Sequence, residues 1–153
     1  FRAKLKFQDL APNTPFEVGP FRVIAEAGQH PDGVMAYRVE AGGRSVVFAT
    51  DIEHGDDIDE RLVRLSEGVD MLIHDAQYTA DEYSGRTGPS RRGWGHSSIE
   101  QALDVAQRAS VGRLALFHHD PTRSDDQVAV LEADAASRRR GTIAAREGKV
   151  FAL

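Results

Sequence analysis

The run from Ser45 to Asp51 constrains the fold most, because apolar, β-branched and aromatic residues lead directly to an aspartate. The segment that follows, residues 52–57, is mostly polar. A short apolar run bounded by polar residues is typical of a buried β-strand. The pattern therefore predicts a strand that places the Asp51 carboxylate at the edge of a sheet.

The first fifty residues have the composition of a β meander. Apolar stretches alternate with turns rich in glycine, proline and asparagine, and such alternation is typical of consecutive hairpins. The expected strands before the Asp51 run are a short one through Leu5, Phe7 and Leu10, followed by 16–18, 21–27 and 34–40.

The rest of the chain alternates helical and strand patterns. Capping-box spacings at Ser97-x-x-Glu100 and Ser124-x-x-Gln127 predict that helices begin at these two serines. The second helix should end near Gly141. The other expected elements are a helix through 58–65, strands at 69–73 and 113–117, a polar loop over 75–95, and short strands at 143–145 and 149–152.

Composition narrows the compartment and the chemistry. At 153 residues, with 41% hydrophobic and 28% charged residues, the chain fits one globular domain. No apolar run reaches the roughly 20 residues of a membrane helix, and no secretory signal opens the chain, so we expect a cytoplasmic protein without membrane association. Cysteine is absent, so any metal site must use nitrogen and oxygen donors. A net charge of -5 gives no general attraction for RNA.

Four of the six histidines fall where a predicted strand ends or a helix begins: His30, His74, His96 and His118. Such positions are where a rigid sheet presents functional groups. His30, Asp51 and His118 each end a strand, and neutral imidazole and carboxylate bind zinc, manganese or iron when thiolate is absent. These three residues are therefore candidate metal ligands.

Four segments, together with the strand pair around His30, resemble the metallo-β-lactamase fold hydrolases, in particular the branch of the tRNA 3′-processing endonuclease and related phosphodiesterases. The segments are 47–51, 71–78, 93–98 and 114–121, in the family's order. The resemblance implies an α/β fold: half of an αββα sandwich with a mostly antiparallel or mixed sheet flanked by helices.

The resemblance also implies roles for single residues. Asp51 matches the aspartate that bridges two metal ions, while His30 and His118 match the histidines that complete one shell each. His96 matches the catalytic histidine that contacts the scissile phosphate, and Asp75 matches the acid that orients it. His74 and His119 are expected to pack or to form hydrogen bonds rather than to bind metal.

The metal ligands present are too few for a complete site. The resemblance implies two divalent ions, with zinc preferred over manganese or iron, and a bridging hydroxide as nucleophile. The family's largest ligand group, a His-x-His-x-Asp-His run, is absent from these 153 residues. We therefore expect residues 1–153 to be the C-terminal portion of one domain, completed by a missing N-terminal segment or a partner chain.

The expected function is hydrolysis of a small-molecule or nucleotide phosphodiester, with Asp51 as bridging ligand and His96 as acid. His96 could instead cap the helix that follows it. Other esters, thioesters or lactones are alternative substrates, and a non-catalytic half-domain that binds a partner is the alternative from another class. Arginines around Trp94, at positions 86, 91 and 92, could form a basic and aromatic lip for a phosphorylated or nucleotide substrate, although a solvated loop is the preferred interpretation. Glu53 and His54 follow Asp51 closely enough to contact and support the metal ligands, although a solvated acidic loop is again the preferred interpretation.

Overall fold

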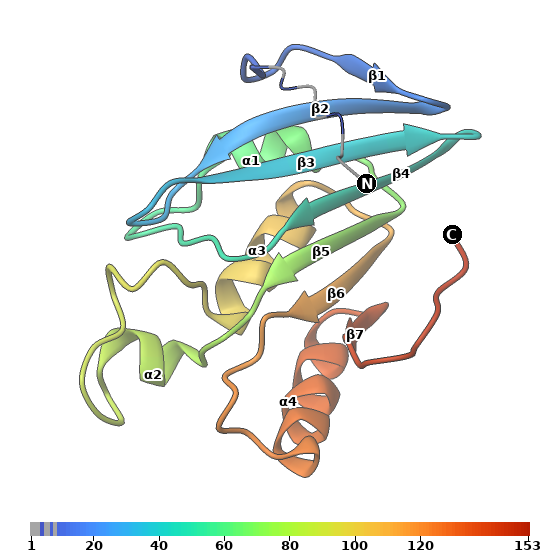
Figure 1. The fold of residues 1–153 in the computed structure, drawn as a ribbon. Helices are drawn as coiled ribbons and strands as arrows, with labels where there is room; N and C mark the ends of the chain where they lie inside the picture. Colours follow the sequence, from blue (N-terminus) through green and yellow to red (C-terminus); the bar gives the residue numbers. More distant parts are fainter. Residues whose placement is uncertain (1–3, 5–6, 8) are drawn as a thin grey trace.

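A single mixed β-sheet, whose strands lie in sequence order, organises the part of the chain that the structure describes (Figure 1). The structure is a computed structural model and describes residues 4, 7 and 9–153. The strands are β1 (Phe16–Val18), β2 (Phe21–Gly28), β3 (Val34–Ala41), β4 (Arg44–Ala49), β5 (Met71–Asp75), β6 (Arg113–Phe117) and β7 (Thr142–Ala144). The helices are α1 (Glu60–Leu65), α2 (Ala80–Ser84), α3 (Ile99–Arg108) and α4 (Asp125–Arg138). The predicted α/β class with a mixed sheet flanked by helices is confirmed.

The two halves of the sheet differ in strand direction because their connections differ. Strands β1 to β4 pair antiparallel through tight turns, and the β3–β4 turn uses Gly42 and Gly43, both at positive φ. Two adjacent residues at positive φ are what a two-residue hairpin loop requires. Strands β4 to β7 pair in parallel, and helix-containing crossovers join them, as parallel pairing demands.

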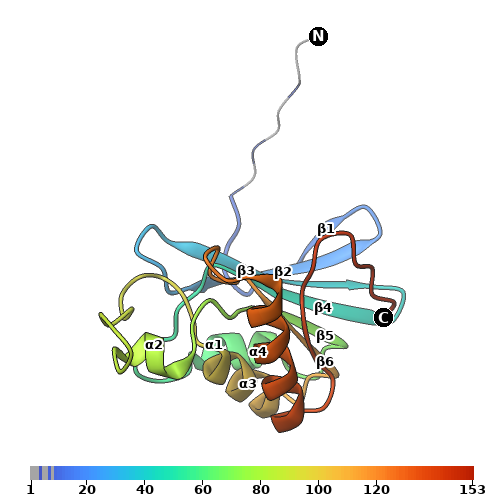
Figure 2. The ribbon, with the colours of Figure 1, turned by 90° about the horizontal axis from the view of Figure 1, so that it is seen from below.

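Helices α1, α3 and α4 cover one face of the sheet (Figure 2). Alternate strand residues point toward them and form the core, with Val47, Leu72 and Leu114 all fully buried. The helices contribute apolar side chains such as Leu62 and Val105 to the same cluster. Among the described residues, no helix combines the length and apolarity needed to cross a membrane.

The opposite face of the sheet carries no helix from the described residues (Figure 2). Phe48 of β4 is 43% exposed and Phe117 of β6 is 37% exposed, and their ring centroids lie 6.0 Å apart. Large aromatic side chains gathered on one surface usually mark a place where another protein surface packs.

Several predicted boundaries are wrong by a few residues. The helix expected from Ser97 begins one residue later, because Ser98 and Gln101 form the capping box. The strand expected at 69–73 runs from Met71 to Asp75, so Asp75 ends a strand instead of opening a loop. The loop expected over 75–95 contains α2, and residues 149–152 form no strand. Of the predicted first strand, Leu5 lies outside the described residues, and Phe7 and Leu10 belong to no strand, so the prediction is wrong for these two residues.

Candidate metal centre

Five predicted site residues converge at one edge of the sheet. Strands β2, β4, β5 and β6 run in the same direction, so their carboxyl ends share this edge. His30 and Asp51 lie two residues beyond their strands, Asp75 ends β5, and His118 directly follows β6. His96 reaches the same place from the loop before α3. The structure thus brings together all five residues.

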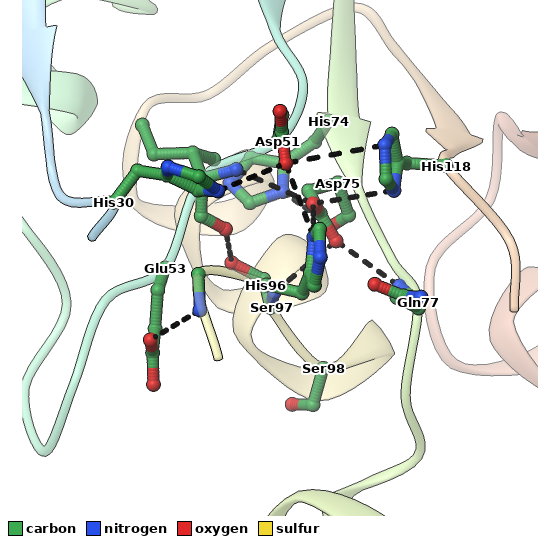
Figure 3. Close-up of polar contacts among 12 residues, drawn as sticks. His30, Asp51, Glu53, His74, Asp75, Gln77, His96, Ser97, Ser98 and His118 are labelled. Atoms are coloured by element: carbon green, nitrogen blue, oxygen red, sulfur yellow. Dashed lines mark hydrogen bonds and ion pairs between the residues drawn. The ribbon is translucent and has the colours of Figure 1, made fainter. Parts of the chain in front are cut away.

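Three imidazoles surround the Asp51 carboxylate (Figure 3). Asp51 Oδ1 lies 3.3 Å from His30 Nε2, 3.5 Å from His96 Nδ1 and 4.0 Å from His118 Nε2. One ligand-capable atom from each of Asp51, Asp75, His96 and His118 lies within 4.8 Å of the others. The Asp51 side chain is 47% exposed, so its carboxylate faces open space.

Asp51 and His118 adopt unusual backbone conformations. Their φ angles are +60° and +59°, in the left-handed region that side chains with a Cβ rarely occupy. Such strain is about 1–3 kcal/mol per residue and is concentrated at functional sites. In both residues this backbone conformation, close to the end of the strand, directs the side chain toward the cluster.

Asp75 differs from Asp51 because both of its carboxylate oxygens already accept hydrogen bonds from the protein. It is fully buried, and its Oδ1 accepts hydrogen bonds from the amides of Gln77 and Ser97, both at 3.1 Å. Its Oδ2 accepts from the Ile52 amide at 3.3 Å and from His96 Nδ1 at 3.0 Å. The bond to Asp75 places the proton of a neutral His96 on Nδ1 and leaves Nε2 as the free nitrogen.

His30 is held beside Asp51 by its own loop. The Asp32 amide donates to His30 Nδ1 at 3.1 Å, so the neutral ring carries its proton on Nε2, which faces Asp51. Metal binding at Nε2 requires the other tautomer and loss of the bond from Asp32.

Glu53 ties the loop before His96 to the rest of the site, and the prediction that it lies in a solvated loop is wrong. It is 2% exposed and accepts from Tyr83 Oη at 2.6 Å, from the Gly93 amide at 2.8 Å and from the Gly95 amide at 2.9 Å. Burial, followed by the bond to Glu53, raises the pKa of Tyr83. No local sequence signal separates Glu53 from its exposed neighbours, because its partners lie 30, 40 and 42 residues away.

We expect Gly95→Ala to weaken metal binding by displacing His30. A Cβ at Gly95 would lie 2.3 Å from His30 Cδ2 and 2.6 Å from His30 Nε2, so the imidazole must move away from Asp51. Gly93→Ala is the matched control, since both glycines have positive φ, +80° and +90°, but a Cβ at Gly93 meets nothing within 4 Å. Chelator-competition titrations should show a larger loss of metal affinity in Gly95→Ala, and equal losses would contradict this arrangement.

His54 and His74 form a buried hydrogen-bonded pair behind the cluster. The Asp59 amide donates to His54 Nδ1 at 3.1 Å, the two Nε2 atoms lie 3.0 Å apart, and His74 Nδ1 lies 2.6 Å from the Asp75 carbonyl oxygen. These contacts fit one proton pattern, in which His74 donates to the carbonyl and His54 donates to His74. Both rings are therefore neutral, and each of their nitrogen atoms has a hydrogen-bond partner. The prediction of a solvated loop is wrong for His54 as well.

The pair makes stability depend on pH. Burial, and next the nearby His74, lowers the pKa of His54 from 6.5 to about 3. As the pH falls, the imidazole of His54 is protonated in the unfolded chain before it is protonated in the folded protein. The free energy of unfolding is therefore highest above about pH 6.5 and falls by up to about 1.4 kcal/mol per pH unit below that value. Urea unfolding at pH 7 and pH 5 should show a smaller loss in His54→Gln, which keeps an amide donor but cannot be protonated. If His54→Gln lost as much stability between pH 7 and pH 5 as the wild type does, His54 would not be neutral in the folded protein.

The chemistry of the cluster fits a divalent metal ion. Neutral imidazole nitrogens and carboxylate oxygens are the usual donors for zinc, manganese and iron in cysteine-free sites. His118 Nδ1 is also buried without a hydrogen-bond partner among the described residues. Buried polar atoms are normally satisfied, so a missing partner at this edge is consistent with a place for a cation.

Comparisons with known proteins agree with this fold. The Beta-lactamase superfamily domain matches residues 2–119. Ribonuclease Z of Thermoplasma acidophilum is 34% identical over 72% of this chain and 35% of its own length. Ribonuclease Z of Thermococcus sibiricus is 38% identical over 52% of this chain and 22% of its own length.

Two solved structures share the fold. The metallo-beta-lactamase fold protein YhfI from Bacillus subtilis has a TM-score of 0.73 at 24% identity, over 93% of this chain and 52% of that one. Human tRNase Z, short form, has a TM-score of 0.61 at 20% identity, over 90% of this chain and 45% of that one. The chain thus spans about a third or less of these curated relatives and about half of these structures. On the match to residues 2–119, which is most of its length, the chain belongs to the beta-lactamase superfamily.

Proposed function

We propose that this chain forms one side of a metal-dependent phosphodiesterase site. The observation that carries the proposal is the half-exposed Asp51 carboxylate among three imidazoles, beside the buried Asp75–His96 pair. Relatives named ribonuclease Z support a phosphodiester as the substrate. When bound, divalent ions would supply Lewis acidity and lower the pKa of a coordinated water.

The two aspartates, Asp51 and Asp75, have different roles in this proposal. Asp75 already accepts four hydrogen bonds, three of them from backbone amides, so it has little capacity left for a metal ion. Asp51 is partly exposed and lies within 4.0 Å of three histidines. We assign Asp51, His30 and His118 as metal ligands and Asp75 as the residue that orients His96.

His96 is assigned to the substrate and not to the metal. Its Nδ1 is engaged by Asp75 at 3.0 Å, which leaves Nε2 for a substrate oxygen. The ring stacks on His118 with centroids 4.8 Å apart, which fixes its plane beside the metal ligands. In the protonated form, Nε2 can hold a proton against the leaving oxygen of the phosphodiester and release it as the bond breaks.

We also propose that a second segment completes the site. Two ions, zinc in our preferred assignment, need more ligands than Asp51, His30 and His118 provide. The sheet face opposite the helices, with Phe48 and Phe117 exposed, has the character of a surface covered by another sheet. A segment packed there would supply the remaining donors at the same edge.

Hydrolysis assays of the intact gene product test this function. With zinc or manganese bound, the protein should hydrolyse bis-p-nitrophenyl phosphate, and chelation should abolish the activity. A chelator-treated sample to which metal is restored serves as the control. Turnover of thioesters or lactones without phosphodiester hydrolysis would overturn the proposed substrate class.

A further inference from the structure

One arginine in the loop before His96 forms no ion pair within the described residues. Arg86 pairs with Asp81, and Arg92 pairs with Asp56. Arg91, by contrast, forms no ion pair with a described residue, although Asp120 is near: the pKa of Asp120 is lowered by its hydrogen bond to Thr122 and, to a smaller extent, by the charges of Arg123 and Arg91. Since none of the Arg91 side-chain N–H groups donates to a described acidic side chain, its planar set of donors is available for a ligand.

The Arg91 guanidinium lies against aromatic rings. Its carbon is 4.3 Å from the centroid of the Trp94 ring and 5.9 Å from that of Tyr78. Trp94 is 52% exposed, although indole rings are usually well buried. With the guanidinium over one face and half of the side chain exposed, the Trp94 ring retains surface on which a flat ligand can stack.

The backbone holds Trp94 in place. Amides on both sides of it, from Gly93 and Gly95, donate to the buried Glu53 carboxylate at 2.8 and 2.9 Å. The Trp94 amide itself donates to the Arg91 carbonyl at 3.2 Å. A rigidly presented aromatic ring loses little entropy when a ligand binds.

This loop borders the candidate metal centre. Gly95 packs directly against the His30 imidazole, and His96 follows it in sequence. The Tyr78 ring, next to Arg91, lies 6.1 Å from the His96 ring in an edge-on arrangement. A ligand held by Arg91 and Trp94 would therefore extend to the histidines of the cluster.

We propose that Arg91 and Trp94 bind a nucleotide unit of the substrate, with the guanidinium on a phosphate and the indole stacked on an unpaired base. Guanidinium groups bind phosphate oxygens in pairs, and bases stack on aromatic side chains largely regardless of sequence. This inference rests on the proposed phosphodiesterase function and narrows its substrate to single-stranded or free nucleotides. It also assigns Arg91 and Trp94 to substrate binding, outside the metal ligands.

Fluorescence of Trp94 in the intact protein tests the inference. The Trp94 signal is the difference between wild type and Trp94→Phe, and the two probes are AMP and ribose 5-phosphate, which lacks a base. AMP should quench this signal saturably, and ribose 5-phosphate should not. Arg91→Gln should weaken AMP binding about tenfold, the usual scale for loss of a charged hydrogen bond.

Arg86→Gln is the matched control, because that arginine lies in the same loop but is already paired. It should leave AMP binding within about twofold, which is the scale of a change at an exposed surface residue. Equal responses to AMP and ribose 5-phosphate, no quenching by AMP, or equal losses in the two arginine variants would each overturn the inference.

The outcomes also separate this inference from the phosphodiesterase proposal. Hydrolysis of bis-p-nitrophenyl phosphate without AMP quenching would refute the nucleotide site and leave the phosphodiesterase. AMP quenching that depends on Arg91, in a protein that hydrolyses no phosphodiester, would support the binding site and refute the reaction.

Discussion

Asp51→Asn is expected to abolish metal binding by the intact protein and, with it, hydrolysis. The substitution preserves side-chain size but removes the charge that lies within 4.0 Å of three imidazoles. Loss of residues that only support metal ligands reduces affinity by about 10–100-fold, so loss of the central carboxylate should exceed that range. Titration with a competing chelator measures the affinity, and urea unfolding verifies that the variant is folded.

Asp57→Asn is a suitable control for Asp51→Asn. Asp57 lies in the same acidic segment and is exposed, so the change alters net charge equally without touching the cluster. Metal affinity and hydrolysis should match those of wild type. Wild-type affinity in Asp51→Asn would refute the assignment of Asp51 as a ligand.

His96→Ala is expected to retain the metal ions and to lose about 10²–10⁴-fold in turnover, the usual contribution of a positioned acid. Its Nδ1 is already engaged by Asp75 at 3.0 Å, so the imidazole is oriented by a carboxylate and is available to substrate through Nε2. The measurements are metal content and kcat for bis-p-nitrophenyl phosphate on the same preparation.

His119→Ala provides the comparison for His96→Ala. His119 follows the cluster residue His118 but is not among the groups gathered around Asp51. Its replacement should change turnover by far less. If His96→Ala instead lost metal in proportion to activity, His96 would be a metal ligand. The assignment of His96 to the substrate and of Asp51 to the metal would then be wrong.

Much of the fold follows from local patterns in the sequence. The Gly42-Gly43 turn and the apolar run before Asp51 specify a hairpin and a buried strand without reference to distant residues. The predicted strand 113–117 agrees with the structure, since its apolar run follows Gly112 and ends at the polar His118. Helix starts are less certain, because Ser97 and Ser98 both have a capping partner three residues on, and only tertiary contacts decide between them. Ser97 instead donates its amide to Asp75 and its hydroxyl to the Ile52 carbonyl.

The candidate site also contains residues that the sequence indicates and others that only the fold reveals. Residues at strand ends, such as His30, Asp51 and His118, could be selected from position and from resemblance to a known family. Glu53 and His54 could be noted only for their closeness to Asp51, and their burial could not be predicted, because it depends on residues that are remote in the sequence. A charged residue in an acidic loop is usually solvated, and only the fold shows that Glu53 holds the loop beside His96.

The most direct test of the account is the metal content of the intact gene product and of residues 1–153 alone, measured by mass spectrometry after dialysis. We predict two divalent ions per molecule in the intact protein, and fewer in residues 1–153 alone, because in our proposal a second segment supplies part of the ligand set. Absence of divalent metal from both, after loading with zinc or manganese, would contradict a metal centre at Asp51.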